Sequence, residues 1–170
     1  IRRPRPDEFQ LKEAAEKIKS SKNPIIISGG GVCYSDAMDE LSNFAIKHNI
    51  PVTQTVMGYS TMKRDHSHYA GQIGGLGGKN TNSLAKQTDL AIAVGTKLAD
   101  FTTGSWANFE NPKFKLVSIN AARFDANKHM AQAVVGDAKV SLIELSQALG
   151  NWKADESWYK KSRMELKSWD

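Results

Sequence analysis

A short apolar run in the middle of the chain constrains the fold most strongly. The five residues Leu90–Val94 (LAIAV) are all apolar, follow the polar pair Thr88-Asp89 and end at Gly95. A run without polar alternation is typical of a strand that is covered on both faces, as in a parallel sheet. Five residues between polar and breaking neighbours are too few for a buried helix. The run therefore predicts a central strand of a parallel α/β sheet, with its carboxyl end at Gly95.

Strands and helices alternate along the rest of the chain. Short apolar runs predict strands at 25–27, 51–55, 90–94, 115–119 and 133–135. Apolar residues at helical spacing predict helices over 7–22, 35–48, 80–87 and 137–149. Residues 56–79 are rich in glycine and are expected to be irregular. The fold class that follows is α/β, with an open, mostly parallel, Rossmann-like sheet of about six strands and helices on both faces.

Three residues mark the predicted helix ends. Asp7 and Asp137 precede helical patterns and are expected to be N-caps. Asn49 follows the helix that begins near Ser35 and is expected to end it.

The two ends of the chain differ from its middle. Residues 1–6 (IRRPRP) are charged and broken by proline, which predicts a linker. Residues 7–150 carry the alternating pattern and are expected to form one domain. Residues 151–170 are expected to be a linker towards a further, C-terminal domain, since their tryptophans have no evident partner within the chain. These tryptophans are Trp152, Trp158 and Trp169.

Composition argues against several kinds of partner. The net charge is +5, but no basic stripe is interleaved with aromatic residues, so nucleic acid is not an expected partner. No apolar stretch approaches the roughly 20 residues needed to cross a bilayer, and no signal peptide opens the chain, so no membrane partner is expected. Cys33 is the only cysteine, which excludes a disulfide framework and fits a reducing compartment. The expected location is the cytoplasm.

The histidine pair His66 and His68 is the closest approach to a metal motif. It flanks Ser67 beside Asp65, but no third ligand follows at a suitable spacing. The segment is therefore expected to be a surface turn, and no metal ligand is predicted.

Gly29-Gly30-Gly31, between the first predicted strand and the next helix, has two interpretations. Without Cβ atoms, backbone N–H groups can approach a phosphate at a helix N-terminus. Alternatively, the glycines serve only a tight structural turn. The segment continues VCY and so departs from the dinucleotide fingerprint G-x-G-x-x-G.

No catalytic residue can be assigned. The sequence contains neither a GK[ST] phosphate-binding loop nor a G-x-S-x-G nucleophile elbow. Asp65, Asp100 and His129 have no partner group at a fixed spacing.

The expected ligand site is a crevice at the carboxyl ends of the strands. The strand order should reverse between the strands at 25–27 and 90–94, and such a reversal opens a cleft. Backbone N–H groups there, with the start of the helix after Ser35, would favour an anion. The residues expected to bind in the crevice are Gly29, Gly30, Gly31, Gly95, Thr96, Lys97 and Asn120.

Five segments, taken in order, resemble the central domain of thiamine-diphosphate-dependent enzymes. They are ISGGGV (27–32), NIPV (49–52), QTDLAIAVGTKLADFTTGSW (87–106), KLVSIN (115–120) and VVGDAKVSLIEL (134–145). The resemblance covers roughly residues 7 to 150. Two segments, DFTTGSW (100–106) and FDANKH (124–129), are most similar to the branch that opens the ring of a trihydroxycyclohexane-dione to 5-deoxy-glucuronate in myo-inositol catabolism.

The resemblance implies a full-length enzyme of three α/β domains that uses thiamine diphosphate and Mg²⁺ and forms a homo-oligomer. This chain would be the middle domain, with N- and C-terminal domains of the same chain as its partners. The family's cofactor-binding Gly-Asp-Gly motif has no match here, because Gly136-Asp137 is followed by Ala138. The fragment is therefore not expected to hold thiamine diphosphate or Mg²⁺ by itself.

Some relatives carry FAD on loops that match Gly29–Gly31 and Gly95–Leu98. This chain has Lys97 where many of them have arginine, and Asn120 where an acidic residue is common. FAD is therefore not an expected cofactor. Three hypotheses follow: the structural middle domain of a ring-opening hydrolase, a nucleotide-binding module for FAD or NAD, and the central domain of an acetolactate-synthase-like enzyme.

Overall fold

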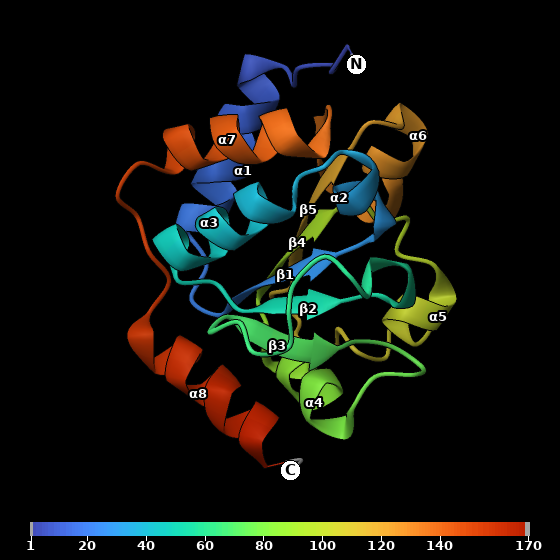
Figure 1. Ribbon diagram of the computed structural model, residues 1–170, viewed down its shortest axis with the longest axis vertical. Helices are drawn as coiled ribbons and strands as arrows, with labels where there is room; N and C mark the ends of the chain where they lie inside the picture. Colours follow the sequence, from blue (N-terminus) through green and yellow to red (C-terminus); the bar gives the residue numbers. More distant parts are fainter. Residues whose placement is uncertain (1, 169–170) are drawn as a thin grey trace.

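The computed structural model describes residues 2–168 and contains one six-stranded sheet (Figure 1). The strands are β1 (Pro24–Ser28), β2 (Val52–Gln54), β3 (Tyr69–Gln72), β4 (Leu90–Val94), β5 (Lys115–Asn120) and β6 (Gln132–Val135). Their order is β3-β2-β1-β4-β5-β6, and every neighbouring pair is parallel. The predicted Rossmann-like sheet is confirmed.

Helices cover both faces of the sheet, as predicted (Figure 1). One face carries α1 (Glu8–Lys19), α3 (Met38–His48) and α7 (Ala138–Leu149), and the other carries α4 (Lys79–Gln87) and α8 (Glu156–Lys167). Short helical segments lie in the connections that leave the strands: α2 (Gly30–Tyr34), η1 (Val56–Gly58), α5 (Asp100–Thr103), α6 (Arg123–Ala126) and, directly before β6, η2 (Lys128–Met130). Within residues 2–168, no helix has the length and apolar character needed to cross a bilayer.

The central strands are buried on both faces, which explains their continuous apolar sequence. In β4, Leu90, Ile92 and Val94 join the core beneath α1, α3 and α7, whereas Ala91 and Ala93 join the core beneath α4 and α8. Successive side chains of a strand point to opposite faces, so each layer of helices needs its own apolar residues from the same strand.

The helix ends follow the predicted capping residues. The carboxylates of Asp7 and Asp137 each accept hydrogen bonds from two backbone N–H groups in the first turn of α1 and α7. Asn49 ends α3 in the left-handed conformation, with a φ of 55°. An asparagine tolerates this conformation better than most residues with a side chain.

The expectation that residues 56–79 are irregular is wrong at β3. Tyr69 pairs with Val52 and Gln72 pairs with Gln54, so β3 forms one edge of the sheet. The strand has no continuous apolar run, because Gly71 and Gln72 form half of it. Gly71 also has a φ of 95°, outside the range of regular strands. An edge strand with one glycine gives little signal in the sequence.

The C-terminal segment belongs to the packed structure of this chain. Trp158 is only 3% exposed, and its indole N–H donates to the carbonyl oxygen of Pro24 over 2.8 Å. Trp152 packs against the core on the other face. The expectation that these tryptophans lack a partner within the chain is therefore wrong, while Trp169 lies outside the described residues. The assignment of residues 151–170 as a linker to another domain stays a prediction.

Candidate ligand crevice

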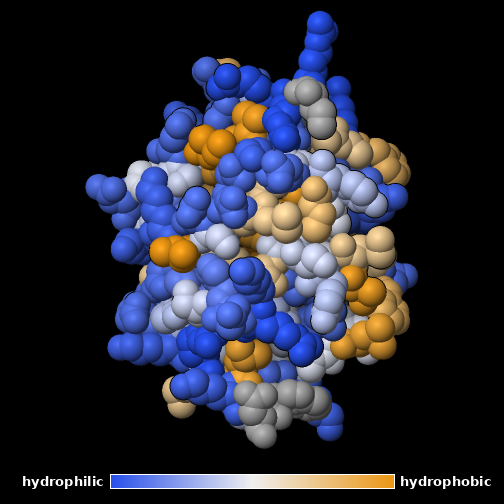
Figure 2. All heavy atoms as spheres, in the orientation of Figure 1, coloured by the Kyte–Doolittle hydropathy of each residue, from blue (hydrophilic) through white to orange (hydrophobic). Residues whose placement is uncertain are grey.

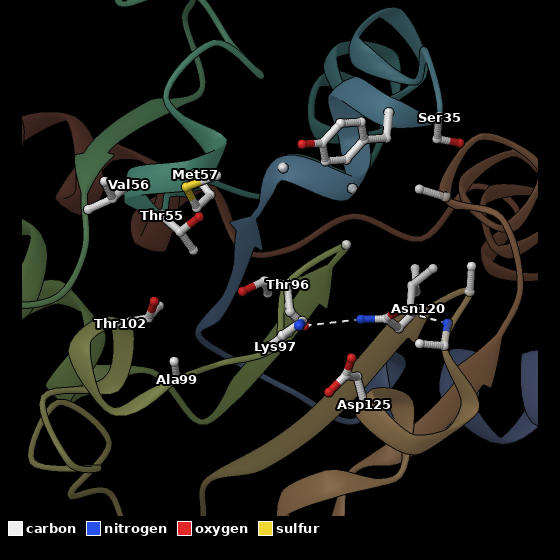
Figure 3. Close-up of a pocket in the computed structure, with 18 of the residues that line it drawn as sticks. Ser35, Thr55, Val56, Met57, Thr96, Lys97, Ala99, Thr102, Asn120 and Asp125 are labelled. Atoms are coloured by element: carbon white, nitrogen blue, oxygen red, sulfur yellow. Dashed lines mark hydrogen bonds between the residues drawn. The ribbon is translucent and has the colours of Figure 1, made fainter.

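A cavity of about 750 Å³ lies at the carboxyl ends of the strands (Figure 3). The strand order reverses there between β1 and β4, as predicted. The loops after β1, β2, β4 and β5 line the cavity. Six of the seven expected site residues lie in its wall, namely Gly30, Gly31, Gly95, Thr96, Lys97 and Asn120. The seventh, Gly29, is buried and does not line the cavity.

The glycines of the first loop permit close packing between two backbones. The N–H groups of Gly29 and Gly31 donate to the carbonyl oxygens of Val94 and Gly95, each over 2.9 Å. A Cβ on Gly29 would lie 2.5 Å from the Gly95 oxygen, and a Cβ on Gly31 would lie 2.6 Å from the Gly95 Cα. The structural interpretation of the triple glycine therefore accounts for Gly29 and Gly31. Their two N–H groups are already engaged and are not available to a phosphate.

The helix next to the crevice begins earlier in the chain than predicted. Helix α2 starts at Gly30, directly after the strand, and Ser35 is the residue that ends it. The following helix, α3, starts only at Met38. The expectation that a helix beginning after Ser35 points its N-terminus into the crevice is therefore wrong. Helix α2 could not be predicted, because its start lies within Gly29-Gly30-Gly31 and these glycines show no helical spacing of apolar residues.

Asn120 joins the loops after β4 and β5. Its side-chain N–H donates to the carbonyl oxygen of Thr96 over 3.2 Å, and its side-chain oxygen accepts from the N–H of Ala122 over 2.9 Å (Figure 3). The amide is thus occupied at both ends by backbone groups. A carboxylate at this position could not donate to Thr96, so the arrangement explains the presence of an asparagine.

The crevice contains charges of both signs. Lys97 is exposed at the cavity and forms no ion pair with another residue in the described range 2–168. Asp125 also lines the cavity and pairs with Lys128 over 2.7 Å. In Figure 3, Asp125 lies across the crevice from Val56 and Met57. Lys97 is therefore the cation that is free to meet an anionic group of a ligand.

The N-terminal segment is fastened to one end of the crevice. Arg3 donates from Nη1 to the carboxylate of Asp137 over 3.0 Å and to the carbonyl oxygen of Ser35 over 2.5 Å. Ser35 and Asp137 both line the cavity. Burial opposes the ionisation of Asp137, but hydrogen bonds from Ser35, Val140 N–H and Arg3 outweigh it, so the pKa of Asp137 lies below its usual value.

The segment of His66 and His68 forms the expected surface turn, but the side chain of His68 is buried. His68 is 7% exposed, its Nε2 lies 3.2 Å from Asn49 Oδ1, and its ring lies 4.6 Å from that of Tyr159. Burial, followed by the nearby His66 and Arg163 charges, lowers the pKa of His68 to about 4. His68 is therefore a neutral packing residue that connects the end of α3 to α8.

Part of the cavity wall was missed in the sequence. The missed residues follow strand ends in the same way as the predicted ones: Tyr34, Thr55, Val56, Met57, Phe101, Thr102 and Asp125. The available signal was positional, since Val56 and Met57 come directly after the predicted strand at 51–55. Ligand crevices of parallel sheets use the loops of several neighbouring strands, so each of these loops was a candidate.

Comparison with known proteins identifies the family. Residues 11–145 match the thiamine pyrophosphate enzyme central domain, and the chain belongs to this family. Its relatives include proteins named 3D-(3,5/4)-trihydroxycyclohexane-1,2-dione hydrolase. The protein from Clostridium perfringens (strain 13 / Type A) is 39% identical over 169 residues, which cover 99% of this chain and 26% of the relative.

Two further relatives carry the same name. The protein from Clostridium botulinum (strain Alaska E43 / Type E3) is 45% identical over 149 residues, which cover 88% of this chain and 23% of the relative. The protein from Bacillus subtilis (strain 168) is 42% identical over 155 residues, which cover 91% and 24%. The chain thus spans about a quarter of the length of these relatives.

The Gly-Asp pair of this chain, Gly136-Asp137, offers no free carboxylate to a metal ion. Among residues 2–168, no group of three or more His, Cys, Asp or Glu side chains could hold a metal ion. The carboxylate of Asp137, in the one Gly-Asp pair, caps α7 and pairs with Arg3. It is therefore committed to structural contacts.

Proposed function

We propose that this chain is the central, mainly structural domain of a thiamine-diphosphate-dependent enzyme that hydrolyses a C–C bond in the ring of 3D-(3,5/4)-trihydroxycyclohexane-1,2-dione. The observation that carries the proposal is 39–45% identity to proteins of that name over 88–99% of this chain. The family resemblance adds the expected product, 5-deoxy-glucuronate, and a place in inositol catabolism in the cytoplasm.

In this proposal, the chemistry belongs to other parts of the polypeptide. The relatives are about four times longer than this chain, which leaves room for N- and C-terminal domains that hold thiamine diphosphate and Mg²⁺. The central domain positions those domains, and the full-length protein is expected to be a homo-oligomer without nucleic acid or membrane partners. The cofactor, when bound, supplies the carbanion chemistry that breaks the C–C bond.

The test compares the full-length polypeptide with the isolated chain. With thiamine diphosphate and Mg²⁺, the full-length protein should consume the cyclic dione, and omission of the cofactor should abolish this activity. Residues 1–170 alone should give no binding heat when titrated with the cofactor and Mg²⁺. Micromolar binding by the isolated chain would contradict the structural role. A full-length protein that forms acetolactate from pyruvate and ignores the dione would support the acetolactate-synthase alternative.

A second candidate function is nucleotide binding in the crevice, favoured by its volume of about 750 Å³ at the reversal of strand order. We expect no tightly held FAD, because the Asn120 amide is already bonded to backbone groups. Lys97 can meet a phosphate only as a point charge, without the paired hydrogen bonds of an arginine. Gel filtration followed by absorbance in the flavin band is the test, with NAD titration as a companion. Stoichiometric FAD on the purified protein would overturn this expectation.

A further inference from the structure

Exposed apolar side chains are concentrated where the strands end. Of the thirteen large apolar side chains exposed among residues 2–168, seven lie in segments that follow the carboxyl ends of strands. These seven are Tyr34, Val56, Met57, Tyr59, Leu76, Phe101 and Phe124. Figure 2 shows orange, hydrophobic atoms at the right-hand edge of the molecule, over η1 and α5. Gathered exposed apolar groups of this kind mark interaction sites.

Four of these side chains share one surface, which we call the strand-end patch: Tyr34, Val56, Met57 and Phe101. All four line the crevice, and Tyr34 and Met57 both lie next to Gly30. Tyr34 is 86% exposed, Met57 is 73% exposed and Phe101 is 56% exposed. Aromatic residues and methionine are enriched in the buried centre of protein interfaces, where charged residues are scarce. The composition of the patch therefore fits a protein surface as its partner.

The path of the N-terminal segment indicates which part of the polypeptide meets the patch. Arg3 is bound to Asp137 and Ser35, and the N–H of Asp137 donates to the carbonyl oxygen of Pro4 over 2.8 Å. Because Ser35 and Asp137 line the crevice, the chain that leads into residue 2 arrives at the same edge as the patch. In Figure 1, the N-terminal segment lies at the top of the molecule and the C-terminal end of α8 at the bottom.

We propose that the strand-end patch is the docking surface for the domain that precedes residue 2 in the full-length polypeptide. The partner surface is apolar, carries few charges and covers the mouth of the crevice. This inference rests on the proposed role as a central domain, which the family description and the greater length of the relatives support. A small polar ligand would bind this surface less well than an apolar protein surface, because the N–H of Gly31 and the amide of Asn120 already form hydrogen bonds within the chain.

Methionine oxidation in the full-length protein tests the proposal with an internal control. Met57 in the patch is 73% exposed and Met164 on α8 is 71% exposed, so the two should oxidise at similar rates in an undocked domain. Under hydroxyl-radical labelling, docking should slow the oxidation of Met57 at least fivefold relative to Met164. Equal rates in the full-length protein would overturn the proposal.

Cross-linking identifies the occupant. A benzophenone amino acid in place of Met57 should, after illumination of the full-length protein, be joined to peptides of the domain that precedes residue 2. The same group in place of Met164 should not label those peptides. Cross-links to residues 2–168 of a second copy, cross-links to the following domain, or the absence of a cross-link would each overturn the proposal.

Failure of the inference is distinguishable from failure of the proposed function. Dione hydrolysis is measured on the same wild-type sample that is labelled. Turnover with equal oxidation of Met57 and Met164 would refute the docking surface alone. Protection of Met57, with a cross-link to the preceding domain, in a protein that does not hydrolyse the dione would refute the substrate assignment and leave the docking surface in place.

Discussion

The side-chain amide of Asn120 donates to the carbonyl oxygen of Thr96 over 3.2 Å and so ties the loop after β5 to the loop after β4. The other end of the amide accepts from the N–H of Ala122. One side chain thus fixes two of the loops that line the crevice. A carboxylate could not form both bonds, because it only accepts, whereas an amide donates at one end and accepts at the other.

Replacing Asn120 by aspartate should destabilise the domain. The Asn120→Asp carboxylate would face the Thr96 carbonyl without a proton to donate, and a lost hydrogen bond that leaves such a group unpaired costs about 1–3 kcal/mol. Urea unfolding at pH 7 measures the difference. Asn151→Asp, at an exposed position, is the control for the added charge and should change the free energy of unfolding by less than about 0.5 kcal/mol. Equal effects of the two variants would contradict the role of the amide.

Trp158 should be a major contributor to stability. Its ring is buried against β1, and large-to-small replacement of a buried tryptophan costs about 3–5 kcal/mol. Trp158→Ala should therefore lower the melting temperature by roughly 6 °C or more, since about 1 kcal/mol corresponds to 2–4 °C at this chain length. Met164→Ala, on the same helix but 71% exposed, should leave the melting temperature nearly unchanged. A small effect of Trp158→Ala would show that α8 contributes little to the stability of this domain.

The strands that could be predicted are those with two buried faces. The apolar runs in β1 and β4 arise because both helical layers need side chains from the same strand. At the edge of the sheet this requirement weakens, and β3 shows a sequence with glycine and glutamine in place of an apolar run. Tail residue Trp158 was misassigned for a related reason. Its hydrogen-bond partner is the Pro24 carbonyl oxygen, which is 134 residues away in the sequence. A local sequence pattern cannot indicate a contact between residues so far apart in the chain.

The crevice was located from the sequence because its position depends on topology. Once β1 and β4 are parallel neighbours, the reversal of strand order between them fixes where their loops meet. The roles of individual residues depend on side-chain geometry and could not be predicted. Asn120 could not be recognised as a bridge between loops, and neither Met57 nor Phe101 differs in the sequence from an ordinary core residue.

Acidification should weaken the packing of α8. The pKa of His68 is about 4 in the folded protein, because of burial first and nearby positive charge second, compared with 6.5 for a free side chain. The unfolded state therefore binds a proton more readily, and the stability from neutral His68 is present above pH 6.5 and is lost as the pH falls towards 4. Each pK unit corresponds to about 1.4 kcal/mol, so the loss across this window is at most about 3.5 kcal/mol.

Denaturant unfolding at pH 7.5 and pH 5 measures this dependence. His68→Gln, which cannot take up a proton, should reduce the difference in unfolding free energy between the two pH values. His129→Gln, at an exposed position, should retain the wild-type difference. If His68→Gln shows the full wild-type difference, His68 is not the group responsible.

Gly31 lies in close backbone contact with Gly95 at the crevice. A Cβ on Gly31 would lie 2.6 Å from the Cα of Gly95, which is backbone and has no flexible side chain that could move aside. Gly31→Ala should therefore force β1 and β4 apart at their carboxyl ends, at a cost of about 1–3 kcal/mol or more. Gly75→Ala is the matched control, since its nearest neighbours are ring atoms of Phe101 at 3.0–3.3 Å, and this exposed ring can rotate away. Thermal unfolding of both variants is the measurement, and Gly31→Ala is expected to have a lower melting temperature than Gly75→Ala. Equal melting temperatures would show that the loops after β1 and β4 can separate without loss of stability.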